Sequence, residues 1–107
     1  MSDPLEILFA AMERTGIPVA KFAWATQPEP PWMVVSRTGD GGSLWSDSTL
    51  TDEVQEGTVD LFTREAGAEH MRTVQDALKA LGWPFELYLV LYEQDTRLVH
   101  YQWVWRQ

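Results

Sequence analysis

The two histidines are the side chains with the most obvious capacity for chemistry. Together with a carboxylate they could hold a Zn²⁺ ion, which favours imidazole and carboxylate ligands. However, Val74 occupies the position one helical turn after His70, and the same-face strand neighbours of His100 are Leu98 and Gln102. We therefore expect no metal site, and we expect both histidines at the surface or at an interface.

Other catalytic patterns are missing from the sequence. The glycine-rich stretch Gly39–Gly42 lacks the Lys and Ser/Thr of a phosphate-binding loop and does not open a helix. The chain contains no cysteine, which excludes disulfides, thiolate metal sites and a cysteine nucleophile. No serine lies in a nucleophile-elbow pattern. We expect no catalytic residue, no cofactor and no enzymatic activity.

Six tryptophans in so short a chain are a second unusual feature. Indoles can fill a core, line a ligand pocket or anchor a protein interface, and core filling should use most of them. Trp45 differs because it lies in a polar, acidic stretch flanked by glycines. We therefore predict that the acidic segment 39–56 protrudes and packs Trp45 on a neighbouring subunit.

The charge is strongly acidic and unevenly distributed. The net charge is −8, from 16 acidic against 8 basic residues, and no basic residue lies between Arg37 and Arg64. Such a surface should repel phosphate, which disfavours direct binding of DNA or RNA. The candidate residues for a subunit interface or a channel lining are Trp45, Asp47, Asp40, Asp52, Glu53, Glu56 and Trp32.

Length and hydropathy bound the class of protein. A chain of 107 residues is a common size for one domain, and we expect a single domain over 1–107. No stretch approaches the roughly 20 apolar residues of a membrane-spanning helix. The first residues lack a signal-peptide layout, so we expect the protein to stay in the cytosol where it is made.

Two helices are predicted. Asp3 and Pro4 are typical of a helix start, and apolar residues at helical spacing predict a helix from about Pro4 to Thr15. A second apolar stripe runs from Met71 to Leu81. A glycine followed by a proline ends each helix.

Strands are predicted on both sides of the second helix. Val19–Ala25, Trp32–Arg37 and Gly57–Thr63 precede it, and 85–92 and 98–105 form a closing hairpin with both faces largely apolar. A further strand near residue 44 is possible. The order α-β-β-β(-β)-α-β-β predicts an α+β fold, with a mostly antiparallel or mixed sheet and two helices on one face.

This order of features resembles the small tail-completion and tail-terminator proteins of long-tailed bacteriophages and prophages. The resemblance spans nearly the whole chain and is carried by the run Gly16–Ala20, the Pro30–Val35 strand, the acidic tip 45–47, the Val59–Thr63 strand that leads into a helix, and the final hairpin. Departures occur at Lys21, Ser46 and 65–67, where the family pattern has other residues.

The resemblance implies a structural subunit of the virion that is assembled in the host cytoplasm. Such subunits close into a homo-oligomeric ring, commonly a hexamer, at the head-proximal end of the tail. The ring caps the tail tube protein and presents a surface to the head connector or neck proteins. Duplex DNA would pass through the ring without specific binding, and no membrane is involved.

Three alternatives remain open at the level of sequence. A head-closure or neck protein has the same size and forms rings, but binds the connector instead of the tube. An acidic inhibitor that mimics DNA would use the charge of −8 to bind a basic partner in a salt-dependent way. A small-molecule-binding domain would use an aromatic pocket and form no ring.

Overall fold

The computed structural model describes residues 3–40, 55–64 and 68–107, with no account of the side chains of Gly39, Asp40 and Ala68. The two helices are α1 (Pro4–Glu13) and α2 (Ala68–Leu81). The five strands are β1 (Val19–Lys21), β2 (Trp32–Asp40), β3 (Gln55–Thr63), β4 (Phe85–Glu93) and β5 (Leu98–Arg106). The predicted α+β fold and its element order are confirmed.

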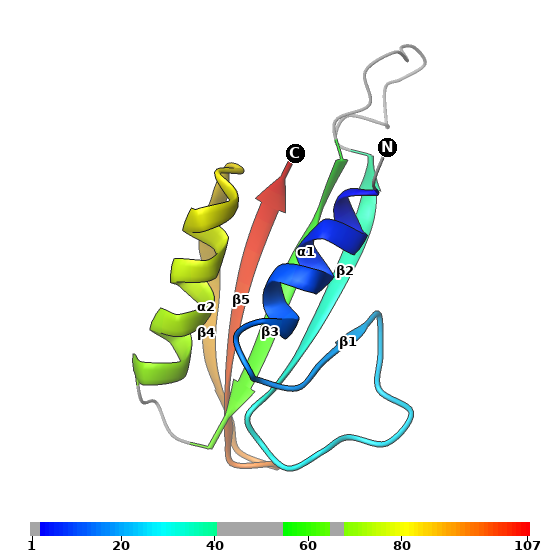
Figure 1. The fold of residues 1–107 in the computed structure, drawn as a ribbon. Coiled ribbons are helices and arrows are strands. Elements are labelled where there is room, and N and C mark those ends of the chain that lie inside the picture. The colour runs from blue at the N-terminus through cyan, green and yellow to red at the C-terminus, as the bar shows by residue number, and fades with distance from the viewer. Residues whose placement is uncertain (1–2, 41–54, 65–67) are drawn as a thin grey trace.

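The five strands form one mixed sheet in the order β1-β2-β3-β5-β4. The short β1 runs parallel to β2, and every other neighbouring pair is antiparallel. Strand β5 therefore lies between β3 and β4, although α2 and β4 separate it from β3 in the sequence. Both helices pack on the same face of the sheet, as expected (Figure 1).

Helix α1 begins at the predicted Pro4 and ends at Glu13, two residues before the predicted Thr15. The Asp3 side chain accepts a hydrogen bond from the amide of Leu5, and Pro4 occupies the first turn, where no amide donor is needed. The helix ends at Glu13, and the chain then turns at Gly16 with a φ of 86°. Only a glycine adopts that left-handed conformation without steric cost.

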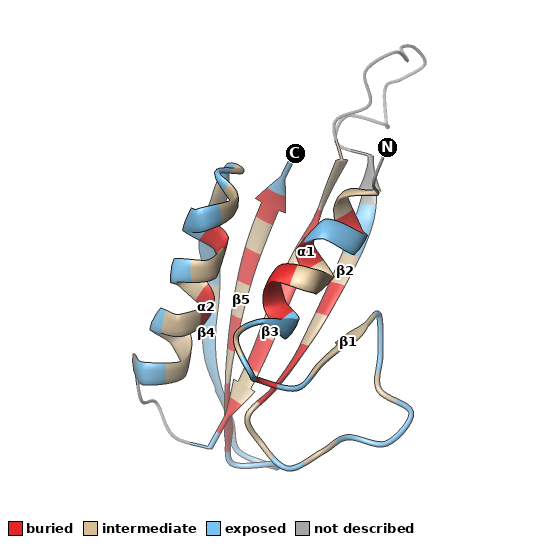
Figure 2. Ribbon diagram, viewed as in Figure 1, coloured by how far each residue is buried: buried red, intermediate tan, exposed pale blue. Residues whose placement is uncertain are grey.

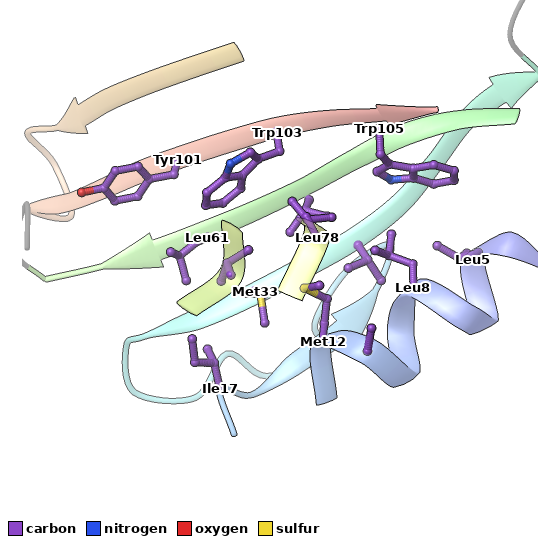
Figure 3. Packing of buried hydrophobic residues seen from close by; sticks show 14 of the residues in the cluster. Leu5, Leu8, Met12, Ile17, Met33, Leu61, Leu78, Tyr101, Trp103 and Trp105 are labelled. Carbon is purple, nitrogen blue, oxygen red and sulfur yellow. The ribbon is translucent and has the colours of Figure 1, made fainter. Parts of the chain in front are cut away.

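The core lies between the helices and the sheet (Figure 3). Leu8 and Met12 of α1 and Leu78 of α2 meet Trp103 and Trp105 of β5, and all five are almost completely buried. The Trp103 indole also donates a hydrogen bond to the side chain of Gln75 on α2, at 3.0 Å. Two tryptophans on one strand thus supply much of the core volume.

The N-terminal strands differ in length from their predicted ranges. Strand β1 ends at Lys21 rather than Ala25, because Phe22 has a φ of 68° that is incompatible with a continuing strand. Strand β2 extends to Asp40, with a ladder irregularity between Arg37 and Gly39. The possible strand near residue 44 lies outside the described residues.

Candidate interaction surface on strand β4 and the uncovered face of the sheet

Strand β4 is an edge strand that exposes apolar side chains. In order of increasing exposure these are Leu87, Leu91, Val90, Tyr92 and Tyr88, the last with 66% of its surface accessible. Figure 2 shows β4 mostly in the colour of exposed residues, whereas β3 and β5 carry a regular series of buried ones. Apolar side chains exposed together in this way make this strand a candidate interaction surface.

The exposed side chains of β4 project to both sides of the sheet. Paired residues on neighbouring strands share a face. Val90 and Tyr92 pair with the buried residues Tyr101 and Val99 on the face that carries the helices, so the helices leave this part of β4 uncovered. Leu91 pairs with His100 on the opposite face. A strand added to β4 would therefore cover apolar surface on both sides.

The usual protection of an edge strand is nearly missing here. Natural sheets keep edges from pairing with other chains by means of charges, prolines or bulges. No charged residue and no proline lies between Glu86 and Glu93. The ladder to β5 shifts register between Leu87 and Leu89, which leaves Tyr88 as the extra residue of a bulge. The edge is thus interrupted once and is otherwise open.

A polar network crosses the face of the sheet that faces away from both helices. Asp60 on β3 binds His100 Nε2 at 2.6 Å, Gln102 Nε2 at 2.8 Å and the hydroxyl of Thr58 at 3.1 Å. The Thr58 hydroxyl also contacts the hydroxyl of Ser36 at 3.0 Å. This network links β2, β3 and β5, and about 15% of the Asp60 side chain is accessible.

The network has the geometry of a cross-strand brace. The His100 ring nitrogens face the carboxylates of Asp60 and Glu93, at 2.6 and 3.8 Å. The Thr58 hydroxyl binds the other oxygen of Asp60 and is not activated by the imidazole. A nucleophile would need a hydrogen bond to its base. The contacts of this network therefore hold strands together and do not form a nucleophile–base pair.

An aromatic stack lies beside the network on the same face. The rings of Trp32 and Phe62 are stacked with centroids 4.1 Å apart, and Phe62 stacks on the His100 ring at 4.2 Å. Trp32, which we predicted as an interface or channel residue, is only 6% exposed. Its largest contacts are therefore made within its own chain.

The remaining predicted interface residues fall into three groups. Glu56 lies on β3 and forms an ion pair with Arg106 at 3.1 Å, with about a third of its side chain accessible. Asp40 ends β2 opposite Gln55, and its side chain is not among those described. The other four candidates lie outside the described residues: Trp45, Asp47, Asp52 and Glu53.

Sequence reasoning did not assign the β4 surface or the Asp60 network to a site. The apolar character of both faces of the hairpin was visible in the sequence, but its exposure depends on how far the helices reach. His100 and Gln102 are 40 and 42 positions away from Asp60 in the sequence, and only the order of the strands brings them together.

Two further observations concern metals and membranes. Within residues 3–40, 55–64 and 68–107, no group of three or more His, Cys, Asp or Glu side chains is arranged to hold a metal ion. Neither of the described helices has the length and apolar character needed to cross a bilayer.

Comparisons with known proteins gave no assignment. The sequence matches no protein-family model, and no curated protein is significantly similar to it.

Proposed function

We propose that this protein is a structural subunit of a phage tail, a ring-forming tail terminator that caps the tail tube and takes part in head-tail joining. The proposal is that it binds copies of itself, the tail tube protein and the head connector, and that it catalyses no reaction. The resemblance described above supplies the family. The observation that carries the proposal is the open, apolar edge of β4.

An open edge strand favours association because its backbone amides and carbonyls are ready to pair. A second chain that adds a strand gains main-chain hydrogen bonds and buries apolar side chains at the same time. The exposed residues Tyr88, Val90, Leu91 and Tyr92 would be covered by such a partner. This favours a binding role over a catalytic one for the part of the surface that is most apolar.

A ring requires a second, different patch on each subunit. The opposite edge of the sheet supplies a candidate, because β1 pairs with only Met33–Val35 of the longer strand β2. The three neighbouring pairs β2–β3, β3–β5 and β5–β4 are all antiparallel. Strands β2 and β4 therefore point in opposite directions. Copies placed side by side in one orientation would therefore bring β4 against the next β2 in antiparallel fashion.

Four ion pairs of the structure reduce the number of carboxylates that the DNA-mimic alternative could use. An inhibitor of that kind needs free carboxylates in a phosphate-like array. Four described carboxylates instead pair with cations of the same chain: Asp3 with Arg37, Glu6 with Lys21, Glu29 with Arg64, and Glu56 with Arg106. These four carboxylates therefore have cationic partners within the subunit, while the net charge of the chain stays at −8.

The direct test is electron microscopy of the purified protein mixed with tail tubes. Rings that cap one end of the tubes are the expected result. Rings that form but ignore the tubes and instead bind the connector would favour the head-closure alternative. A protein that stays monomeric at every concentration and leaves the tubes uncapped would contradict the proposal.

A matched pair of lysine substitutions tests the role of β4. Val90→Lys places a charge on the exposed edge strand, whereas Ala80→Lys places the same charge on the exposed face of α2. Charges block edge pairing. In analytical ultracentrifugation we expect Val90→Lys to abolish self-association and Ala80→Lys to retain it. Equal assembly of the two variants would remove β4 from the interface.

A further inference from the structure

The face of the sheet that is turned away from the helices contains a hollow of about 330 Å³. It lies between the segment that follows β1 and the strands β2 and β3. Four aromatic residues line it, together with one carboxylate. They are Phe22, Trp24, Trp32, Phe62 and Asp60.

Phe22 is held in the hollow at a cost to folding. Its φ of 68° is a left-handed conformation that a phenylalanine rarely adopts, and 59% of its surface is exposed. A hydrogen bond from its amide to the carbonyl of Val35, at 2.8 Å, fixes this conformation. Neither the strain nor the exposure stabilises the fold of the chain. Backbone strain of this kind accumulates at binding sites.

Asp60 contributes a carboxylate whose one basic partner among the described residues is the imidazole of His100. Its partners are His100, Gln102 and Thr58, and the ion pairs of the described residues include none between Asp60 and an ammonium or guanidinium group. A carboxylate has about four lone-pair positions. Three hydrogen bonds therefore leave room for one more donor.

Trp24 makes the wall of the hollow rigid. Its indole Nε1 donates a hydrogen bond to the carbonyl of Met33 at 3.0 Å. The neighbouring Trp32 is fixed by its stack on Phe62. The aromatic surfaces are thus placed before any ligand arrives, which lowers the entropic cost of binding.

Aromatic walls beside a carboxylate that pairs with no Lys or Arg suit a planar cation. A guanidinium group stacks on aromatic rings, donates several hydrogen bonds in one plane and is less strongly hydrated than an ammonium group. We propose that this hollow binds the guanidinium of an arginine side chain on a partner protein. The inference does not depend on the proposed role in a phage tail.

The test uses two capped tripeptides that differ only in charge. Acetyl-Gly-Arg-Gly-amide carries the guanidinium, and the same peptide with citrulline carries a neutral urea group of nearly the same shape. Binding is followed by NMR through the indole N–H signal of Trp24. We expect the arginine peptide to shift this signal and to bind at least about tenfold more tightly than the citrulline peptide, which is the scale of one charged contact. Equal binding, or no shift with either peptide, would overturn the proposal.

Two variants and a control separate binding from folding. Phe22→Gly removes the ring and relieves the positive φ, so we expect an unchanged or higher Tm and binding weakened by about fivefold or more. Asp60→Asn keeps the shape of the side chain that lines the hollow but removes its charge, and we expect it to weaken binding by about tenfold. Tyr88→Ala removes an exposed aromatic ring from β4 and should bind as the wild type does.

The Phe22→Gly result decides the matter if Asp60→Asn fails to fold. A folded Phe22→Gly protein that binds the arginine peptide as tightly as the wild type would show that the hollow is not the site. Loss of binding in the Tyr88→Ala control would assign the peptide to the β4 edge and would equally overturn the proposal.

Discussion

Gly57 on β3 has no room for a side chain. A Cβ built there would lie 2.0 Å from the carbonyl oxygen of Ser36 and 2.7 Å from the Trp105 ring. Gly57 and Trp105 are directly paired in the ladder, so the indole packs over the space that a side chain would need. The glycine is required by packing rather than by its backbone angles.

Two alanine substitutions distinguish close packing from backbone conformation. Gly57→Ala must displace backbone and a buried indole, and we expect a loss of about 3 kcal/mol or more in the free energy of unfolding. Gly16→Ala has open space around it but keeps a φ of 86°, for which we expect a loss of about 1 kcal/mol. Urea denaturation measures both. Equal losses would mean that the strands separate to accommodate the methyl group.

Asp60 is a second residue whose substitution should lower the stability of the fold, because several side chains donate hydrogen bonds to it. Asp60→Ala would leave the donors of His100, Gln102 and Thr58 without their largely buried acceptor, and we expect the free energy of unfolding to fall by about 1–3 kcal/mol. The control is Asp76→Ala on the exposed side of α2, which should change it by no more than about 0.5 kcal/mol. If Asp60→Ala left the free energy of unfolding unchanged, water would replace the carboxylate as an acceptor without cost.

At the scale of elements, two ion pairs join helix α1 to the sheet, in addition to the packing of its apolar side chains. Glu6 pairs with Lys21 of β1, and Asp3 pairs with Arg37 of β2 at 3.1 Å. Both pairs are partly exposed, and such pairs contribute little to stability. Asp3 also caps the helix, so its two roles can be separated by mutation.

Asp3→Ala removes the cap and the ion pair, and we expect it to cost about 1 kcal/mol of unfolding free energy. Asp3→Asn retains a capping oxygen and removes only the charge, so its cost should stay within about 0.5 kcal/mol. Thermal or urea denaturation of both variants measures the difference. If the two lose the same amount, the charge on Asp3 matters more than the cap.

Some of the elements could be predicted from the sequence, and others depend on the tertiary structure. Helix α1 and the β4–β5 hairpin follow from apolar spacing and local capping, which are short-range properties. The end of β1 at Lys21 does not follow, because it depends on the left-handed conformation of Phe22, a residue type that rarely adopts it. The exposure of β4 depends on how far the helices extend over the sheet. Likewise, the meeting of Asp60 and His100 depends on strand order.

At the scale of the whole molecule, the net charge of −8 opposes self-association. In the proposed ring, like charges would repel between subunits as well as within them, whereas the attraction from burying the β4 side chains would depend little on salt. Assembly should therefore depend on how strongly the repulsion is screened.

We expect self-association to strengthen when NaCl is raised from about 0.05 M to about 0.5 M, because the Debye length falls severalfold over that range. Sedimentation velocity at fixed protein concentration measures the change. The Ala80→Lys variant, with one added positive charge, should assemble slightly better at low salt. Weaker assembly at high salt would indicate an interface dominated by attraction between opposite charges.

The position of β5 between β3 and β4 has a consequence for synthesis. While the chain is being translated, both neighbours of β5 leave the ribosome before it does, and neither can form its ladder to β5. Until Trp103 and Trp105 arrive, the space between the two halves of the sheet is unfilled and two apolar strand edges are open at once. Aggregation of nascent chains, and protection by a chaperone, should be concentrated in that interval.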